Sequence, residues 1–488
     1  MLKPTSSEIQ SYAADYSMIP LCREIYADVT TPIALLRKIA QVSNRYCLLE
    51  SVEGGERWGR YSFLGYDPLV HIVCKDHVVT TEYADGRRES VTTDQPNDIL
   101  RALMAQYKAP RIEGFPPFTG GLVGYYAYRM IGYAEPTLHL CSSDVDDFDL
   151  MLFDKVIAYD HLSQKINVIV NMPTDNVLEN YGTARAEIEK IIRLIREPMQ
   201  LPTAHKHCKP QFTCNVTKEE YCDIVNKTKQ HIVDGDIFQA VLSRRFETPY
   251  TDSLLDAYRV LRTTNPSPYM VYLHRDDIEL MSTSPETLVR LRNGRLSTFP
   301  VAGSRPRGAD KEEDLALEKD LLSDEKELAE HNMLVDLGRN DIGKLSQFGS
   351  VEVTDYQMIH RYSRIIHITS VVEGNILPKF DAFDAISTLL PAGTLSGAPK
   401  IRACEIIEEL EPCARGVYGG ALGYVDFTGN MDTCIAIRMA VKKNDRVTIQ
   451  AGGGIVADSV PENEYMESQN KAGAVIAAIE RAAEVDAD

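Results

Sequence analysis

The sequence lacks the features that usually mark membrane and secreted proteins. No apolar run reaches the roughly 20 residues that a membrane-spanning helix needs. The opening segment MLKPTSSEIQSYAADY has neither the charged-then-apolar layout of a signal peptide nor the Arg-rich composition of a transit peptide. The ten cysteines stand singly, without a C-x-x-C pair, which favours a reduced, cytoplasmic protein with buried thiols.

Positive charge is also scarce. The chain has 52 basic and 71 acidic residues, a formal net charge of −19. A field of that sign repels phosphate backbones and anionic lipid, so we expect no nucleic-acid or membrane partner. Apolar residues make up 44% and charged residues 25%, which is typical of globular proteins, and 488 residues can bury a large core.

Strand patterns come in adjacent runs rather than alternating with helices. Residues 45–80 and 118–170 have strand patterns, and an amphipathic helix is expected at 174–196. A Pro-rich stretch within 201–214 predicts a linker between an N-terminal half (1–200) and a C-terminal half (215–488), although the strands of both halves could share one body. This order predicts an α+β fold with large antiparallel sheets.

The second half begins with a clear helix signal. Thr217 and Glu220 form a capping-box pattern, and helical periodicity continues to a stop near Gly235. Further helices are expected at 311–344, 381–390, 400–409 and 461–484. Strands are expected at IFQAVLSRRFE, YMVYLH, LSTFP, IIHITSVVEG, YGGALGYVDF, CIAIRMAVK and RVTIQAGGGIV.

Two pairs of glutamates stand three residues apart on predicted helices. Glu327 and Glu330 follow a helix start expected at Ser323, and Glu464 and Glu467 lie in PENEYMES. Like charges on one helix face repel, so each pair needs a reason to persist. Two such faces could converge on one Mg²⁺, which prefers all-oxygen ligands, but two solvated acidic faces have the same pattern.

Other candidate positions allow two interpretations each. The glycines of AGGGIV (451–456) could bind an anion with backbone N–H groups or form a tight turn. Arg438, inside CIAIRMAV, could pair with a buried carboxylate or point outward. His367 in IIHITS could be catalytic or a satisfied core residue. PAGTLSGAPK (391–400) predicts a loop before a helix, where an anion could bind.

Taken together, these segments resemble the chorismate-utilising enzymes. The resemblance rests on PVAGSRPRG, DEKELAEHNMLVDLGRNDIG, LLPAGTLSGAPK, VYGGALGY, IAIRMA, AGGGIV and PENEYMESQNKAGA, over residues 215–475. LLESVEGGERWGRYSFLG and NPSPYM are similar to the anthranilate synthase component I branch of that family. The resemblance implies that the large antiparallel sheets pack as a sandwich with helices on the outside.

The resemblance assigns the glutamate pairs to one Mg²⁺ that binds the ring carboxylate of chorismate. It implies Glu330 and Glu467 as direct ligands, with Glu327 and Glu464 in support. The implied substrate contacts are Gly303, Ser304, Tyr418, Arg438, Gly452, Gly453 and Gly454. Ser304 replaces the family's usual threonine, and Gly453 replaces the middle alanine of its Gly-Ala-Gly.

The implied chemistry is addition of ammonia to the ring, loss of the C4 hydroxyl and elimination of pyruvate. Glu286 matches the general acid and His367 the histidine of the elimination step, and Thr394 belongs to the same catalytic set. Gln239 stands where water-adding relatives carry a basic lysine. Ala302 stands where aminodeoxychorismate synthases carry a nucleophilic lysine, so ammonia itself must attack.

The resemblance also implies partners and an inhibitor. Ammonia would come from a separate glutamine amidotransferase subunit, in a heterotetramer of two large and two small subunits. L-Tryptophan would inhibit by binding at Ser51, Glu50, Pro268, Tyr269 and Met270. The alternatives are an aminodeoxychorismate synthase and a non-catalytic tryptophan sensor.

Overall fold

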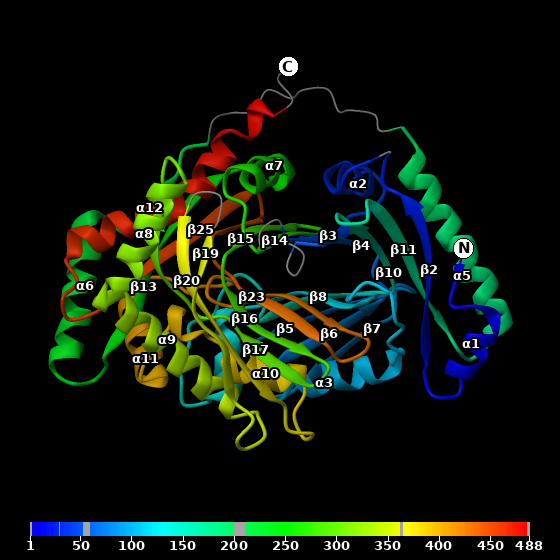
Figure 1. Cartoon of the computed structure of the whole chain (residues 1–488), viewed down its shortest axis with the longest axis horizontal. Helices are drawn as coiled ribbons and strands as arrows, with labels where there is room; N and C mark the ends of the chain where they lie inside the picture. Colours follow the sequence, from blue (N-terminus) through cyan, green and yellow to red (C-terminus); the bar gives the residue numbers. More distant parts are fainter. Residues whose placement is uncertain (1, 29, 52–58, 199–209, 362–364, 486–488) are drawn as a thin grey trace.

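The computed structural model describes the chain except residues 1, 29, 52–58, 199–209, 362–364 and 486–488. Two large sheets are stacked face to face, with helices on their outer faces (Figure 1). The pairings within both sheets are antiparallel. The predicted α+β sandwich with external helices is therefore confirmed.

Thirteen strands form the first sheet. In spatial order they are β1 (Leu2–Lys3), β2 (Met18–Tyr26), β11 (Lys165–Pro173), β10 (Lys155–Asp160), β4 (Tyr61–Tyr66), β3 (Arg45–Glu50), β14 (Tyr269–Arg275), β15 (Ile278–Ser284), β24 (Met439–Lys443), β25 (Arg446–Ile455), β13 (Gln239–Pro249) and β12 (Thr213–Cys214), with β21 (Gly397–Ala398) beside β13.

Twelve strands form the second sheet. They are β18 (Val301–Pro306), β20 (Ile365–Asn375), β17 (Arg295–Thr298), β16 (Thr287–Arg292), β23 (Met431–Ile435), β22 (Ala421–Asp426), β8 (Gly121–Tyr126), β9 (Phe148–Phe153), β5 (Val70–Lys75), β6 (Val78–Tyr83) and β7 (Arg88–Thr92), with β19 (Glu352–Arg361) beside β20. Strands from before and after residue 200 thus share both sheets.

The helices cover the outer faces of the two sheets (Figure 1). They are α1 (Ser6–Tyr12), α2 (Pro32–Ile39), α3 (Pro96–Met104), α4 (Ile131–Ala134), α5 (Val177–Arg196), α6 (Lys218–Val233), α7 (Leu254–Thr264), α8 (Lys311–Ser323), α9 (Glu325–Gly343), α10 (Ala382–Leu389), α11 (Lys400–Leu410) and α12 (Pro461–Glu480). Short 3-10 turns are η2 (Ala105–Tyr107), η3 (Tyr128–Met130), η4 (Gly393–Leu395) and η5 (Ala482–Glu484). None of the helices in the described ranges is long and apolar enough to cross a membrane.

The core lies in layers because strand side chains alternate between two faces. In β3, Tyr46 and Leu48 pack on the helices outside the first sheet, whereas Cys47 and Leu49 pack between the sheets. The inner layer unites Leu49 with Leu422 of the second sheet. The cysteines that the structure describes are unpaired thiols.

Two local expectations are wrong. The helix expected over 311–344 is interrupted, because the side chain of Asp324 caps α9 by accepting from the backbone N–H of Lys326 and Glu327; Ser323 instead ends α8. CIAIRMAV is not one strand but breaks between β23 and β24, where Arg438 has a φ of 47°. The strand expected at RVTIQAGGGIV is confirmed: β25 continues through the three glycines to Ile455, so they do not form a tight turn.

Candidate active site

Glu286 lies where the chain passes from the first sheet to the second. β15 ends at Ser284, β16 begins at Thr287, and the backbone N–H of Ile435 donates to the Glu286 carbonyl at 3.0 Å. The hydroxyl of Thr394 in η4 donates to Oε1 of Glu286 at 3.0 Å. The structure therefore brings these two predicted catalytic residues into direct contact.

Burial raises the pKa of Glu286 to about 7. The hydrogen bond from Thr394 and the positive charges of Lys471 and Arg438 act in the opposite direction. A carboxyl group with a pKa near neutrality can donate a proton at neutral pH and then be reprotonated from solvent. This property fits a general acid, and it comes from the surroundings rather than from the residue type.

His367 is oriented by its neighbour strand. Its Nδ1 lies 3.1 Å from the carbonyl oxygen of Gly303 in β18, and a carbonyl can only accept, so Nδ1 carries the proton. Nε2 is then the ring atom that can accept a proton. Burial lowers the pKa of His367, and the nearby Arg438 lowers it further, which favours the neutral imidazole.

Gly303 links the histidine to the acidic helix α9. It has a φ of 74°, and a Cβ there would lie 3.3 Å from Oε2 of Glu327 and 3.2 Å from Cδ1 of Ile368. Glycine therefore suits both the backbone conformation and the close packing. The adjacent Ser304 is exposed and stands opposite His367 in the β18–β20 register.

The glutamates on α9 and α12 lie close enough together for their charges to affect one another's pKa. Burial and then the charges of Glu327 and Glu467 raise the pKa of Glu330. Burial raises the pKa of Glu464, and the Glu467 charge adds to this shift. We call these four residues the acidic centre. Among the described residues, no three His, Cys, Asp or Glu side chains stand close enough together to hold a metal ion.

The glycine strand lies directly against the acidic centre. A Cβ at position 453 would lie 2.9 Å from Oε2 of Glu464 and 3.5 Å from Oε1 of Glu467. A Cβ at Gly452 would lie 2.1 Å from the Leu242 carbonyl oxygen, so the β13–β25 contact requires glycine there. Gly454 is exposed. The strand thus presents backbone rather than side chains to the glutamates.

Lys471 is a positive charge in this region that the sequence analysis did not single out. It forms an ion pair with Glu467 at 2.7 Å and donates to the Gly452 carbonyl at 3.1 Å. Its charge also lowers the pKa of Glu286 and Glu330. Its position four residues after Glu467 on a helix was the available signal.

Three further residues were predicted to belong to the active site: Arg438, Tyr418 and Gln239. Arg438 is partly buried and its charge acts on both Glu286 and His367. Tyr418 is 6% exposed, and burial raises the pKa of its hydroxyl, which stays protonated. Gln239 begins β13 opposite Ala398, and is partly buried.

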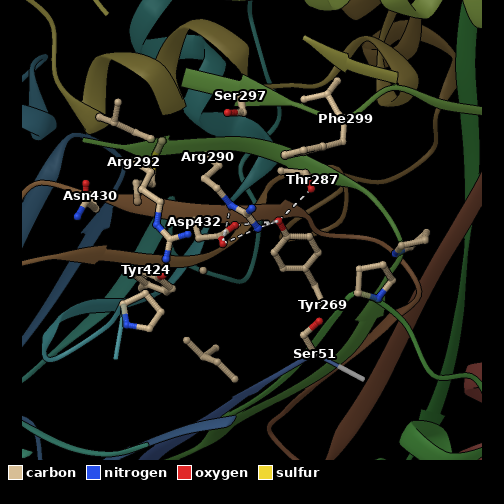
Figure 2. A pocket seen from close by; sticks show the side chains of 18 of the residues that line it. Ser51, Tyr269, Thr287, Arg290, Arg292, Ser297, Phe299, Tyr424, Asn430 and Asp432 are labelled. Carbon is tan, nitrogen blue, oxygen red and sulfur yellow. Dashed lines mark hydrogen bonds and ion pairs between the residues drawn. The ribbon is translucent and has the colours of Figure 1, made fainter. Parts of the chain in front are cut away.

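A separate cavity of about 1110 Å³ lies between the two sheets. All five residues predicted to bind tryptophan line it: Ser51, Glu50, Pro268, Tyr269 and Met270. Figure 2 shows Ser51 and Tyr269 on the side of the first sheet, facing Arg290 and Asp432. We call this space the inter-sheet cavity.

The two walls of the inter-sheet cavity are joined by hydrogen bonds. The Tyr269 hydroxyl donates to Oδ1 of Asp432 at 2.8 Å and lies 2.9 Å from the Thr287 hydroxyl (Figure 2). Asp432 also accepts from Nε of Arg290 at 2.9 Å. Asp432, Arg290 and Thr287 were not predicted from the sequence, because strand register alone brings these strands together.

Glu50 and Ser51 differ in the hydrogen bonds that their side chains make. Glu50 accepts from Nε and Nη2 of Arg262, both at 3.0 Å, and from the Tyr258 hydroxyl at 2.9 Å. The buried hydroxyl of Ser51 has no hydrogen-bond partner within the described part of the chain. A buried polar atom without a partner is costly, so Ser51 is suited to contact a polar ligand.

Comparison with known proteins places this geometry in a family. The family model for chorismate binding enzyme matches residues 47–477. Anthranilate synthase component 1 of Acetivibrio thermocellus is 46% identical over 99% of this chain and 100% of its own length. The corresponding protein of Pseudomonas aeruginosa is 45% identical over 97% of this chain and 98% of its own.

Solved structures agree with these sequence relatives. The crystal structure of anthranilate synthase component I from Streptococcus pneumoniae matches with a TM-score of 0.77 and 36% identity, covering 93% of this chain and 99% of that one. The menaquinone-specific isochorismate synthase of Escherichia coli has a TM-score of 0.70 at 17% identity, covering 97% of this chain and 98% of that one, and shares the fold.

Proposed function

The chain belongs to the chorismate-binding enzymes, and on that premise we propose how its residues make anthranilate. It acts as an anthranilate synthase component I, a lyase that converts chorismate and ammonia to anthranilate and pyruvate. The observation that carries the mechanism is the pairing of a carboxyl group of pKa about 7, Glu286, with a neutral, oriented imidazole, His367.

The two groups divide the reaction into a protonation and a deprotonation. Ammonia forms a bond to ring carbon C2, the double bonds shift, and the C4–O bond breaks. The proton of Glu286 goes to the departing hydroxyl, which leaves as water. The added nitrogen then loses its extra proton to solvent. In the second step Nε2 of His367 accepts the proton from C2 while the C3–O bond breaks and the ring becomes aromatic; the enolpyruvate that departs takes up a proton at its methylene carbon and becomes pyruvate.

The acidic centre fits a divalent cation in chemistry. Its donors are carboxylate oxygens, which Mg²⁺ prefers, and burial together with the charges of neighbouring glutamates raises the pKa of Glu330 and Glu464. We propose that Glu330 and Glu467 hold Mg²⁺, with Glu327 and Glu464 in support. When bound, Mg²⁺ would neutralise the ring carboxylate of chorismate and fix its orientation.

Positive charge and backbone dipoles would bind the rest of the substrate. Arg438 and the backbone N–H groups of the β25 glycines, Gly452 to Gly454, are proposed to take the enolpyruvyl carboxylate, with Tyr418 beside it. Gly303 and Ser304 lie next to His367 and would contact the ring side. An acidic protein can hold a dianion in this way because the local field differs from the net charge.

Two residues support ammonia as the nucleophile. Gln239 has a neutral amide, which cannot activate water as a base. Ala302 is buried and offers no amine. We propose that ammonia is supplied by a separate glutamine amidotransferase subunit, in a heterotetramer of two large and two small subunits, in the cytoplasm.

The inter-sheet cavity is proposed as the site where L-tryptophan inhibits. The unpartnered Ser51 hydroxyl and the backbone of residues 268–270 would hold the amino acid, and tyrosine and phenylalanine side chains in the lining suit an indole ring. Inhibition would require that tryptophan binds an inactive arrangement of the two sheets better than the active one.

The first experiment measures the product. Purified protein with chorismate, Mg²⁺ and ammonium at a pH above about 8, where more ammonium is present as NH₃, should yield fluorescent anthranilate and pyruvate. A chelator should abolish the reaction and added Mg²⁺ should restore it. Accumulation of an aminodeoxychorismate without pyruvate would contradict the role given to His367.

A further inference from the structure

A buried ion pair behind the active site contacts several of its parts. The side chains of Arg415 and Glu411 are 2% and 3% exposed. Nε of Arg415 donates to Oε2 of Glu411 at 2.9 Å, and Nη2 donates to Oε1 at 2.6 Å. Such a two-pronged pair fixes the plane of the guanidinium as well as its position.

The other donors of Arg415 reach two catalytic segments. Nη1 donates to the carbonyl oxygen of Leu395 at 2.5 Å, and Nη2 donates to that of Val241 at 2.6 Å. Leu395 directly follows Thr394, whose hydroxyl donates to Glu286. One guanidinium therefore joins the η4 turn to strand β13, which begins at Gln239.

Glu411 holds β13 from the same place. Its Oε1 accepts from both the backbone N–H and the hydroxyl of Ser243, at 2.7 and 2.8 Å. The guanidinium of Arg415 also lies 4.7 Å from the ring centroid of Tyr128 and 5.7 Å from that of Tyr418. The pair thus contacts the strand, the turn and the tyrosine of the proposed substrate site.

A buried ion pair is a poor source of stability, since apolar residues of similar size often serve as well or better. The pair instead fixes the orientation of its neighbours, because each guanidinium nitrogen and each carboxylate oxygen has a hydrogen-bond partner. We propose that Arg415 and Glu411 are positioning residues that hold η4 so that the Thr394 hydroxyl meets Glu286. This proposal rests on the proposed function, in which Glu286 is the general acid.

The proposal predicts a change in the acidity of Glu286. The hydrogen bond from Thr394 favours the charged carboxylate, so losing that alignment raises the pKa. The other charges that face Glu286 are Lys471 on α12 and Arg438 before β24. Asp341 of α9 lines the same small cavity and is paired with Lys344 at 3.2 Å. None of these contacts Arg415 or Glu411 among the hydrogen bonds described.

The decisive variant is Arg415→Lys, which keeps the charge but cannot form the two-pronged contact. The alkaline limb of the kcat–pH profile should move up by about half a pH unit or more, and kcat should fall about tenfold with KM little changed. Thr394→Val should shift the limb in the same way. The double variant should show the shift of one change alone, because both act through one contact.

The matched control is Arg402→Lys on α11, which alters a half-buried arginine paired with Asp236 and Glu405. It should leave the profile unchanged. If Arg415→Lys only lowers the melting temperature, with an unchanged limb or shifts that add to those of Thr394→Val, the positioning role is refuted. Should Arg415→Lys fail to fold, Ser243→Ala decides by the same criteria, because it removes one contact to Glu411.

A second readout separates this proposal from the proposed function. Carboxyl ¹³C NMR of glutamate-labelled protein, with Glu286→Gln to assign the signal, gives the pKa of Glu286 without turnover. Parent protein that makes no anthranilate would refute the function alone. An equal Glu286 pKa in parent protein and Arg415→Lys would refute the positioning role, whatever the activity.

Discussion

In the inter-sheet cavity, the polar side chains of the two walls already hold one another. Tyr269, Asp432 and Arg290 form a connected set between the first and second sheets. In the acidic centre, the charges of Glu330 and Glu467 oppose one another, and within the described residues no metal-holding cluster is closed. The polar groups of the cavity are therefore already paired with one another, whereas those of the acidic centre repel one another, as we would expect if the proposed cation and substrate complete that site.

The difference follows from how each region is positioned. The cavity lies between two sheets whose register is fixed along many strand pairs, so its side chains have little freedom. The acidic centre lies between helices α9 and α12 and the end of β25, where long glutamate side chains lie beside the backbone of Gly453. Under the proposed roles, a rigid cavity suits a regulatory ligand, and adjustable side chains suit a site that admits a dianion and a cation.

The largest effect should come from Glu286→Gln, which removes the proposed acid but keeps its shape. Turnover with ammonium should fall about 10²- to 10⁴-fold. Tryptophan binding, measured by calorimetry, should stay within threefold because the cavity wall is intact. Loss of both turnover and tryptophan binding would show that the two regions depend on one another, and would contradict the distinction drawn between them.

The cavity is tested by filling it. Ser51→Phe places a ring where a small hydroxyl now lies, and tryptophan inhibition should weaken at least about tenfold, from the loss of a buried polar contact and of space. Turnover without tryptophan should stay within about threefold. Inhibition curves for parent and variant proteins decide this, with Ser90→Phe on the exposed strand β7 as the control. Equal inhibition of Ser51→Phe and parent would place the inhibitor elsewhere.

The pH dependence should report the acid of the active centre. Glu286 must be protonated to act, so kcat should fall as pH rises through its pKa of about 7. This limb is visible when rates are compared at constant NH₃ rather than constant total ammonium. A flat profile between about pH 6 and 9 under that condition would contradict the assignment.

The acidic centre should be a weak point of the cation-free protein. Burial and the charges of Glu327 and Glu467 raise the folded-state pKa of Glu330, so stability is lost as pH rises from the unfolded-state pKa to this higher folded-state pKa. Glu330→Gln should therefore raise the melting temperature by a few degrees at neutral pH in the presence of a chelator. Below about pH 4 the variant and parent should melt alike. A lower melting temperature of Glu330→Gln at neutral pH would contradict the repulsion.

The smallest effect is expected from Gly453→Ala. A methyl group there would lie 2.9 Å from Oε2 of Glu464, so the carboxylate must move by a few tenths of an ångström. Mg²⁺ affinity measured by activity titration should change by about threefold or less, since the end of a flexible, half-buried glutamate side chain can shift at low cost. A loss of a hundredfold would show that the acidic centre is as rigid as the cavity.

Much of the fold could be predicted from the sequence, because hydrophobic period and caps are local. The Thr217–Glu220 capping box and the strand at IFQAVLSRRFE are present in the structure. Arg438 marks the limit: its left-handed backbone breaks an apolar run that has an unbroken strand pattern. That conformation is imposed by the tertiary structure and overrides local propensity.

The site was predictable only where a motif places its residues close together in sequence. Sequence spacing identifies two pairs of glutamates, Glu327 with Glu330 and Glu464 with Glu467. Only the family resemblance assigns both pairs to one site. The contact of Thr394 with Glu286 and that of Tyr269 with Asp432 join residues more than a hundred positions apart. Only strand register and the passage between sheets bring them together, so no local pattern reveals them.

Glu286 and Thr287 are neighbours in the chain, yet one faces the active centre and the other the inter-sheet cavity. A single peptide bond therefore carries both the proton donor and a wall of the proposed inhibitor site. If both proposed roles hold, a change at Thr287 made to weaken inhibition should also disturb catalysis through its neighbour. Under the same proposals a change at Ser51, in the opposite wall, should weaken inhibition and leave turnover intact.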